Sequence, residues 1–117
     1  MFHKIIIVGR LGADPEQKYT VDGKAVTSFS VAAENRKDET LWFRVSAWEK
    51  LADVCGRYLK KGAKVLVEGT LRADGAGNPR VYERKDGLGW AASFEVVASS
   101  VKFLSGKEDA PADEVPF

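Results

Sequence analysis

Two tryptophans, an arginine and a serine are predicted to share one face of a β-strand. Residues 41–48 alternate with the two-residue period of a strand, so every second side chain points to the same side. One side would carry the polar and aromatic set Trp42, Arg44, Ser46 and Trp48. The other side would be wholly apolar, with Leu41, Phe43, Val45 and Ala47. Flat rings interleaved with a cation can stack on unpaired nucleobases while binding their phosphates, so we expect the function to reside on this strand.

Further aromatic and basic residues could extend such a surface. Tyr82 and Trp90, in and beside the long segment 72–89, are candidates for additional base stacking. For Trp90, packing in the core or in a hairpin is the alternative. Phosphate contacts are predicted for basic residues at strand ends and in loops, namely Arg10, Lys18, Arg36, Lys37, Arg44, Lys50, Lys61, Arg72, Arg80, Arg84 and Lys85. Any one of them could be an ordinary solvated side chain, so their number matters more than their identity.

The residue types that catalysis or metal binding needs are scarce and scattered. Cys55 is the only cysteine and His3 the only histidine, which excludes an intramolecular disulfide and a thiolate zinc site. Cys55 lies on the apolar stripe of a predicted helix, which favours a buried structural thiol over a catalytic partner of His3. Carboxylates fall in different elements without metal-ligand spacing, at Asp14, Glu16, Glu34, Glu49 and Glu68. We therefore predict a protein that is not an enzyme and holds no metal or cofactor.

The composition is that of one soluble globular domain. The 117 residues are 44% hydrophobic and 30% charged, and no apolar run reaches the ~18 residues that span a membrane. The apolar stretch within residues 1–10 is too short for a signal peptide, so a cytoplasmic protein is expected. Residues 1–104 hold 17 lysines and arginines against 13 acids, a net +4, whereas residues 105–117 hold one lysine against four acids, a net −3. This predicts a basic domain over 1–104 and a short flexible acidic tail over 105–117.

Hydrophobic periodicity and turn signals predict five strands and one helix. The strands are expected over residues 4–11, 25–35, 41–48, 64–71 and 90–103. Asp22-Gly23 is a hairpin signal ahead of the second strand. The helix is expected over residues 49–59, with one apolar stripe formed by Leu51, Val54, Cys55, Tyr58 and Leu59. The glycine-rich segment 72–89 would form a long, partly paired arm.

This order of elements is typical of an oligonucleotide-binding (OB) barrel. The predicted fold is all-β in class, mainly strands with one helix. It is a five-stranded OB-fold barrel with the helix between strands 3 and 4 and a long hairpin arm between strands 4 and 5. In such a barrel the second and third strands form the binding face, which is where residues 42–48 would lie.

Several motifs, in order along the chain, resemble the bacterial-type single-stranded-DNA-binding protein (SSB) family. Residues 6–16, IIVGRLGADPE, are similar to the family's opening V-I-L-V-G-x-L-G-x-D-P-E. WFRV at 42–45 resembles its W-x-R-V strand, and VEGTLR at 67–72 resembles a later strand. KLADV at 50–54 and YLKKG at 58–62 are similar to its helix and helix end. The last five residues, DEVPF, resemble the D-D-I-P-F tip of many members, so the resemblance covers nearly the whole chain.

The resemblance implies sequence-independent binding and protection of single-stranded DNA in replication, recombination and repair. It assigns base stacking to Trp42, Trp48 and Tyr82, and it implies a cytoplasmic, nucleoid-associated homotetramer. It also implies that replication and repair proteins dock on the acidic tip, formed by Asp113, Glu114, Val115, Pro116 and Phe117.

Three features depart from the family pattern. The link at 35–39 lacks the tryptophan that many members carry there. Residues 73–79 look like an insertion ahead of Tyr82. Residues 105–112 are far shorter than the glycine-rich linker of most members, so partners docked on the tip would be held close to the barrel.

Other functions remain open from the residues alone. A single-stranded RNA-binding OB protein would use the same base faces and phosphates. A primosome-like protein-interaction adaptor would use the exposed aromatic side chains to bind protein. A hydrolase or nuclease is disfavoured, because no metal or nucleophile site can be assembled from this sequence.

Overall fold

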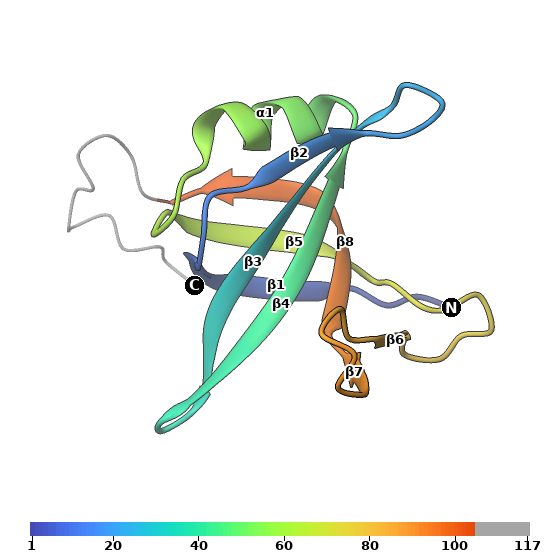
Figure 1. The fold of residues 1–117 in the computed structure, drawn as a ribbon. Coiled ribbons are helices and arrows are strands. Elements are labelled where there is room, and N and C mark those ends of the chain that lie inside the picture. The colour runs from blue at the N-terminus through green and yellow to red at the C-terminus, as the bar shows by residue number, and fades with distance from the viewer. Residues whose placement is uncertain (105–117) are drawn as a thin grey trace.

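The computed structural model describes residues 1–104 as a strand-rich fold with one helix (Figure 1). The elements in chain order are β1 (Ile5–Leu11), β2 (Glu16–Tyr19), β3 (Ala25–Arg36), β4 (Glu39–Trp48), α1 (Lys50–Tyr58), β5 (Lys64–Leu71), β6 (Val81–Glu83), β7 (Trp90–Ala92) and β8 (Phe94–Phe103). Within these residues, no helix is long and apolar enough to cross a bilayer.

Five of the strands close into a barrel. Their order around it is β1-β5-β8-β4-β3, and β3 returns to pair with β1 through Arg10 opposite Ala32 and Leu11 opposite Val31. The β4–β8 pair is parallel and the other pairs are antiparallel. The helix follows the third barrel strand and precedes the fourth. The prediction of a five-stranded OB-fold barrel with one inserted helix is therefore confirmed.

Two glycines allow the barrel strands to approach closely. A Cβ added to Gly9 in β1 would collide with the carbonyl oxygen of Ala32 in β3. A Cβ added to Gly69 in β5 would collide in the same way with the carbonyl oxygen of Val97 in β8. A side chain at either position would force the two backbones apart, so glycine is required where these strands meet.

The barrel interior is filled by every second residue of the strands. Phe43, Val45 and Ala47 of β4 are buried, as their alternation predicts. They join Val31 of β3 and Val67 of β5 in one contiguous core. With the apolar side of β4 used for the core, the opposite side is left to face outward.

Helix α1 packs against the barrel through a narrower face than its sequence predicts. Cys55 and the residue just after the helix, Leu59, are buried as expected, but Val54 and Tyr58 are exposed, so that part of the predicted stripe is wrong. Ala52 is fully buried instead, and the Thr27 hydroxyl of β3 donates a hydrogen bond of 2.7 Å to its carbonyl oxygen. The helix therefore packs on the barrel through its small residues.

The predicted hairpin arm and the predicted fifth strand are divided at a different residue in the structure. The predicted fifth strand, 90–103, is interrupted at Ser93. Its first part, β7, pairs with β6 as a separate two-stranded hairpin, and its second part, β8, joins the barrel. In Figure 1 this hairpin lies beside the lower part of β8. The predicted hairpin arm thus exists, and it borrows its second strand from the predicted fifth one.

Strand β2 is an addition that the sequence analysis did not predict. It pairs with the first residues of β3, from Glu16 opposite Ser28 to Tyr19 opposite Ala25. All four of its residues are exposed, so the segment has no apolar alternation to detect. The Asp22-Gly23 turn that joins the two strands forms as predicted, with Gly23 at φ 83°.

Candidate nucleic-acid interface

Trp42, Arg44, Ser46 and Trp48 form a row along the outer face of β4, here called the aromatic row. The side chains of Trp42 and Trp48 are 52% and 40% exposed, while the intervening apolar residues are buried. Both indoles are therefore displayed outward, as the alternation predicts. Their neighbours across the β3–β4 register are small or medium-sized, namely Ala32, Ser30, Ser28 and Val26. The two indoles consequently project beyond the smaller side chains of β3, and solvent can reach their ring faces.

The position of Trp42 depends on a glycine in another element. A Cβ at Gly12, in the turn after β1, would lie 2.6 Å from Cζ3 and 2.9 Å from Cη2 of the Trp42 indole. The six-membered part of the indole therefore lies against the backbone of Gly12. This contact supports one part of the ring and leaves the rest exposed.

A groove beside the aromatic row brings together four of the predicted phosphate-binding residues. It has a volume of about 590 Å³ and runs between the β3–β4 face and the β6–β7 hairpin. Its basic lining residues are Arg44, Arg72, Arg80 and Lys85, and its acidic ones are Glu83 and Glu95. We call it the basic groove. Four cations against two carboxylates give it an excess of positive charge, which suits a polyanion.

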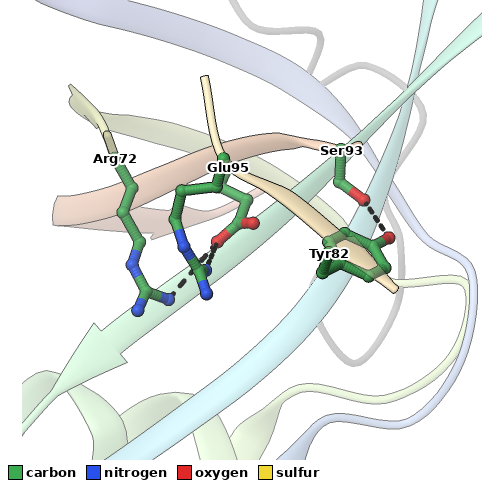
Figure 2. A network of polar contacts seen from close by, with 5 residues as sticks. Arg72, Tyr82, Ser93 and Glu95 are labelled. Atoms are coloured by element: carbon green, nitrogen blue, oxygen red, sulfur yellow. Dashed lines mark hydrogen bonds and ion pairs between the residues drawn. The ribbon is translucent and has the colours of Figure 1, made fainter. Parts of the chain in front are cut away.

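Glu95 links two of these arginines at the bottom of the groove. Its carboxylate Oε1 accepts hydrogen bonds from Nη1 of Arg80 at 2.7 Å and from Nη1 of Arg72 at 3.3 Å. The Glu95 side chain is 9% exposed, whereas those of Arg72 and Arg80 are 47% and 34% exposed. Figure 2 shows Glu95 beside Arg72, with Tyr82 and Ser93 nearby. Each guanidinium keeps further N–H groups for another oxyanion, since one carboxylate oxygen uses only one of its five donors.

The two remaining stacking candidates lie on the hairpin. Tyr82 of β6 lines the basic groove, and its hydroxyl lies 2.8 Å from Oγ of Ser93 (Figure 2). Trp90 of β7 is 69% exposed and pairs in register with Glu83. The alternative that Trp90 packs in the core is therefore wrong. Its ring lies on the same hairpin as Tyr82 but does not line the basic groove.

The other predicted cations are spread around the barrel. Lys18 of β2 shares the outer face with Trp48, because both lie opposite Val26 of β3. The guanidinium of Arg84 is paired with Asp86 at 2.6 Å, which reduces its availability. The remaining five occupy turns and element ends outside the groove: Arg10, Arg36, Lys37, Lys50 and Lys61.

Sequence reasoning missed Glu95 of the basic groove and two residues next to it in the chain, Phe94 and Ser93. Phe94 shares the inward phase of Val96 and Ala98, so its period predicts a core residue; at the start of β8 it is 55% exposed instead. Glu95 is out of phase with that core, and its ion-pair partners Arg72 and Arg80 lie between β5 and β6, distant in sequence. Ser93 carried no signal beyond its position before the strand.

The structure supports the structural role predicted for Cys55. Its side chain is fully buried, and burial raises the pKa of the thiol to about 11. His3 lies elsewhere, where its Nε2 accepts a hydrogen bond from the Leu71 amide at 3.0 Å. Across residues 1–104, no group of three His, Cys, Asp or Glu side chains is placed to hold a metal ion. The predicted tip residues Asp113, Glu114, Val115, Pro116 and Phe117 lie outside the described residues.

Comparison with known proteins identifies one family, and the relatives below share one description. A model of the single-strand binding protein family matches residues 2–104. A "Single-stranded DNA-binding protein" of Neisseria meningitidis serogroup A is 37% identical over 96% of this chain and 67% of its own length. One of Xanthomonas campestris is 38% identical, covering 90% of this chain and 62% of its own length. "Single-stranded DNA-binding protein 1" of Chlorobaculum tepidum is 32% identical over 91% of this chain and 67% of its own length. The chain thus spans about two thirds, or less, of these relatives.

Proposed function

Because the chain belongs to the single-strand binding protein family, we propose that it binds single-stranded DNA without regard to base sequence. Family membership agrees with the resemblance drawn from the motifs and with the prediction of a non-enzymatic protein. The proposed place of action is the cytoplasm, on unpaired DNA exposed during replication, recombination and repair.

The observation that carries this proposal is the aromatic row with the basic groove beside it. Bases would stack on the exposed indoles of Trp42 and Trp48, and on Tyr82 at the hairpin. Each stacked base contributes about 1–3 kcal/mol, whatever its identity, because every base has a π-face. Phosphates between these bases would lie along Arg44 and the other groove cations. Stacking and charge without base-edge recognition predict tolerance of sequence.

Tryptophan fluorescence during titration with oligo-dT tests the proposal. The three tryptophans are Trp42, Trp48 and Trp90, and all are substantially exposed, so stacked bases should quench most of the emission. Affinity should fall with salt, with a slope of log K against log salt of about −0.7 for each phosphate neutralised. Absence of quenching at low salt would remove the proposal.

RNA binding is separated from DNA binding by competition in the same titration. Oligo-rU of matched length should displace oligo-dT poorly if DNA is the ligand. Stronger competition by the ribose oligomer would instead favour the RNA-binding alternative, because its 2′-hydroxyl is the feature that distinguishes the two strands.

The proposal includes recruitment of partner proteins by residues 113–117. The sequence there offers an apolar anchor, Phe117, beside acidic side chains, which suit a pocket rimmed by lysines or arginines. Removing Val115–Phe117 should abolish recruitment and leave oligo-dT affinity intact. If that truncation removed every activity while DNA affinity of the full chain proved negligible, the primosome-like adaptor would be the better account.

Self-association into four copies is the remaining part of the proposal. The outer face of β1 carries Ile6, which is 60% exposed, and Val8, which lies opposite Leu66 of β5. An apolar strand face of this kind favours pairing with a second copy. Light scattering of the full chain, with and without oligo-dT, measures the subunit number; a monomeric mass under both conditions would contradict this part.

A further inference from the structure

An apolar slot adjoins the aromatic row on the side away from Arg44. It has a volume of about 400 Å³, with Trp42 and Phe94 among its walls and Pro79 and Ser93 beside them. We call it the apolar slot. Neither the sequence analysis nor the family match assigns a ligand to it.

The apolar slot is continuous with the basic groove. A smaller hollow of about 240 Å³ lies between them. It shares Arg72 and Glu95 with the basic groove, and Pro79, Ser93 and Phe94 with the apolar slot. A chain whose phosphates follow the groove cations would therefore bring its next base to the slot without leaving the surface.

The inserted segment 73–79 contributes Pro79 to the slot and lines the smaller hollow beside it with Ala73, Gly77 and Asn78. Its turn is closed by Asp74. The Asp74 carboxylate Oδ1 accepts hydrogen bonds from the amides of Ala76 at 2.8 Å and Asn78 at 3.1 Å. The Asp74 amide donates in turn to the Asn78 carbonyl at 3.0 Å. These amide donors lower the pKa of Asp74, so its side chain closes the turn as an ionised carboxylate at neutral pH. Pro79 directly follows this closed turn.

The slot is also lined by the ring of Phe94, which lies beside an open strand edge. The ring of Phe94 lies 5.8 Å from that of Phe43, centroid to centroid, and more than half of Phe94 remains exposed. Pairing of β4 with β8 begins only at Phe43 opposite Phe94, so residues 39–42 of β4 lie beyond the start of β8. Polar backbone groups on that edge of β4 are placed next to an apolar, aromatic slot.

We propose that the apolar slot binds one nucleobase of the single strand, held by Trp42 and Phe94 and bordered by Pro79, which follows the Asp74–Asn78 turn. This inference rests on the proposed function and assigns a role to the insertion, which the family pattern lacks. A planar base with a polar edge matches aromatic walls beside an open strand edge. The continuity with a cationic groove favours a nucleic-acid base over an apolar side chain of a partner protein.

Substitution of Phe94 tests the slot against a matched control at the other end of the same strand. Phe94→Ala should weaken oligo-dT binding about tenfold, the equivalent of one stacked base, while leaving the salt slope unchanged because no charge is lost. Phe103 is the last residue of β8, and its ring centroid lies 6.5 Å from that of Tyr58. Phe103→Ala removes this ring and should leave the affinity for oligo-dT unchanged. Equal affinities for Phe94→Ala and the unaltered protein would overturn the proposal and leave the slot to a protein partner.

Photo-crosslinking places the base independently of any effect of substitution on folding. Oligo-dT carrying 5-iodouracil should crosslink the unaltered protein at Phe94 on irradiation, whereas a crosslink at Trp42 is expected from the aromatic row as well. Trypsin then releases residues 86–102 as one peptide, in which fragmentation separates Phe94 from Trp90. Pro79→Gly, at an exposed position, should reduce this crosslink several-fold.

The outcomes separate the two proposals. Failure of the unaltered protein to bind oligo-dT contradicts the proposed function itself. Strong oligo-dT binding with crosslinks at the tryptophans or on the hairpin, and none at Phe94, contradicts the slot alone.

Discussion

At Trp42, the orientation of a proposed stacking ring is set by the absence of a side chain elsewhere. Gly12 has no Cβ, and the indole uses that space, lying against the backbone of the turn after β1. Gly12 does not have a positive φ, so the glycine is needed for room rather than for an unusual backbone conformation. The ring is thereby held at an angle that leaves half of it open to solvent.

Gly12→Ala should therefore displace Trp42 and weaken binding. The new methyl group would come within 3 Å of two ring carbons, and the ring must move, since it is the more mobile partner. We expect a loss of oligo-dT affinity of up to about tenfold, with little change in melting temperature, because the indole contributes little to the core. The measurement is fluorescence anisotropy of a labelled oligonucleotide.

A double-mutant cycle isolates the mechanism of that effect. In the Trp42→Ala background, Gly12→Ala should have no further effect on affinity, because the ring that it displaces is gone. Additive losses in the double variant would show that Gly12 acts on binding by another route.

The side of the strand to which a residue's position in the alternation assigns it explains which site residues could be predicted. Trp42 and Trp48 were identified because alternation along one strand is local and needs no knowledge of the fold. Phe94 was missed because its phase matches the core, and only the end of the barrel leaves it exposed. Glu95 was missed because its partners, Arg72 and Arg80, come from segments 23 and 15 residues away.

Among the elements, the β6–β7 hairpin is a sheet of its own, attached to the barrel by polar contacts. Arg80 just before β6 bonds to Glu95 of β8, and Tyr82 bonds to Ser93 between β7 and β8. Because the arginines are partly exposed, the Glu95 ion pairs contribute about 1–2 kcal/mol, between the values of surface and buried pairs. Glu95 thereby fixes the hairpin at the edge of the basic groove.

Glu95→Gln should loosen this hairpin and free a cation. We expect a lower melting temperature together with a salt slope steeper by about 0.7, because one guanidinium becomes available to an additional phosphate. Glu83→Gln is the matched control: it removes the same charge from the same groove, from a side chain that makes no ion pair in the described structure. It should leave both the melting temperature and the slope nearly unchanged. Identical behaviour of the two variants would contradict the role given to Glu95.

The elements that the sequence could not predict are those without a periodic signal. Strand β2 is exposed along its whole length, so it shows no alternation. The break at Ser93 depends on the pairing of β7 with β6, which local pattern does not encode. The buried face of the helix was predicted incorrectly because Ala52 and Gly56 are small and allow the helix to approach β2 and β3 closely. A Cβ on Gly56 would lie 2.9 Å from Oε1 of Gln17. This close packing buries the small residues and leaves the larger Val54 and Tyr58 exposed.

At the scale of the whole molecule, the proposed ligand contacts gather on one part of the barrel. The aromatic row, the basic groove and the apolar slot adjoin one another, from Trp48 through Arg44 to Phe94. The family match covers residues 2–104, the same part that carries a net charge of +4. A mildly basic barrel with one stacking surface suits a ligand that offers base faces and phosphates in alternation.

The measurement that tests the account most directly is oligo-dT affinity of the Trp42→Ala/Trp48→Ala double variant, by anisotropy at fixed salt. With about 1–3 kcal/mol lost for each stacked base, affinity should fall at least about 30-fold while the protein stays folded and the salt slope holds. The double control Tyr58→Ala/Phe103→Ala removes two exposed aromatic rings that contact each other, Phe103 at the end of β8 and Tyr58 at the end of α1. It should bind oligo-dT as the unaltered protein does. Undiminished binding by the tryptophan variant would contradict the claim that these two indoles receive the bases.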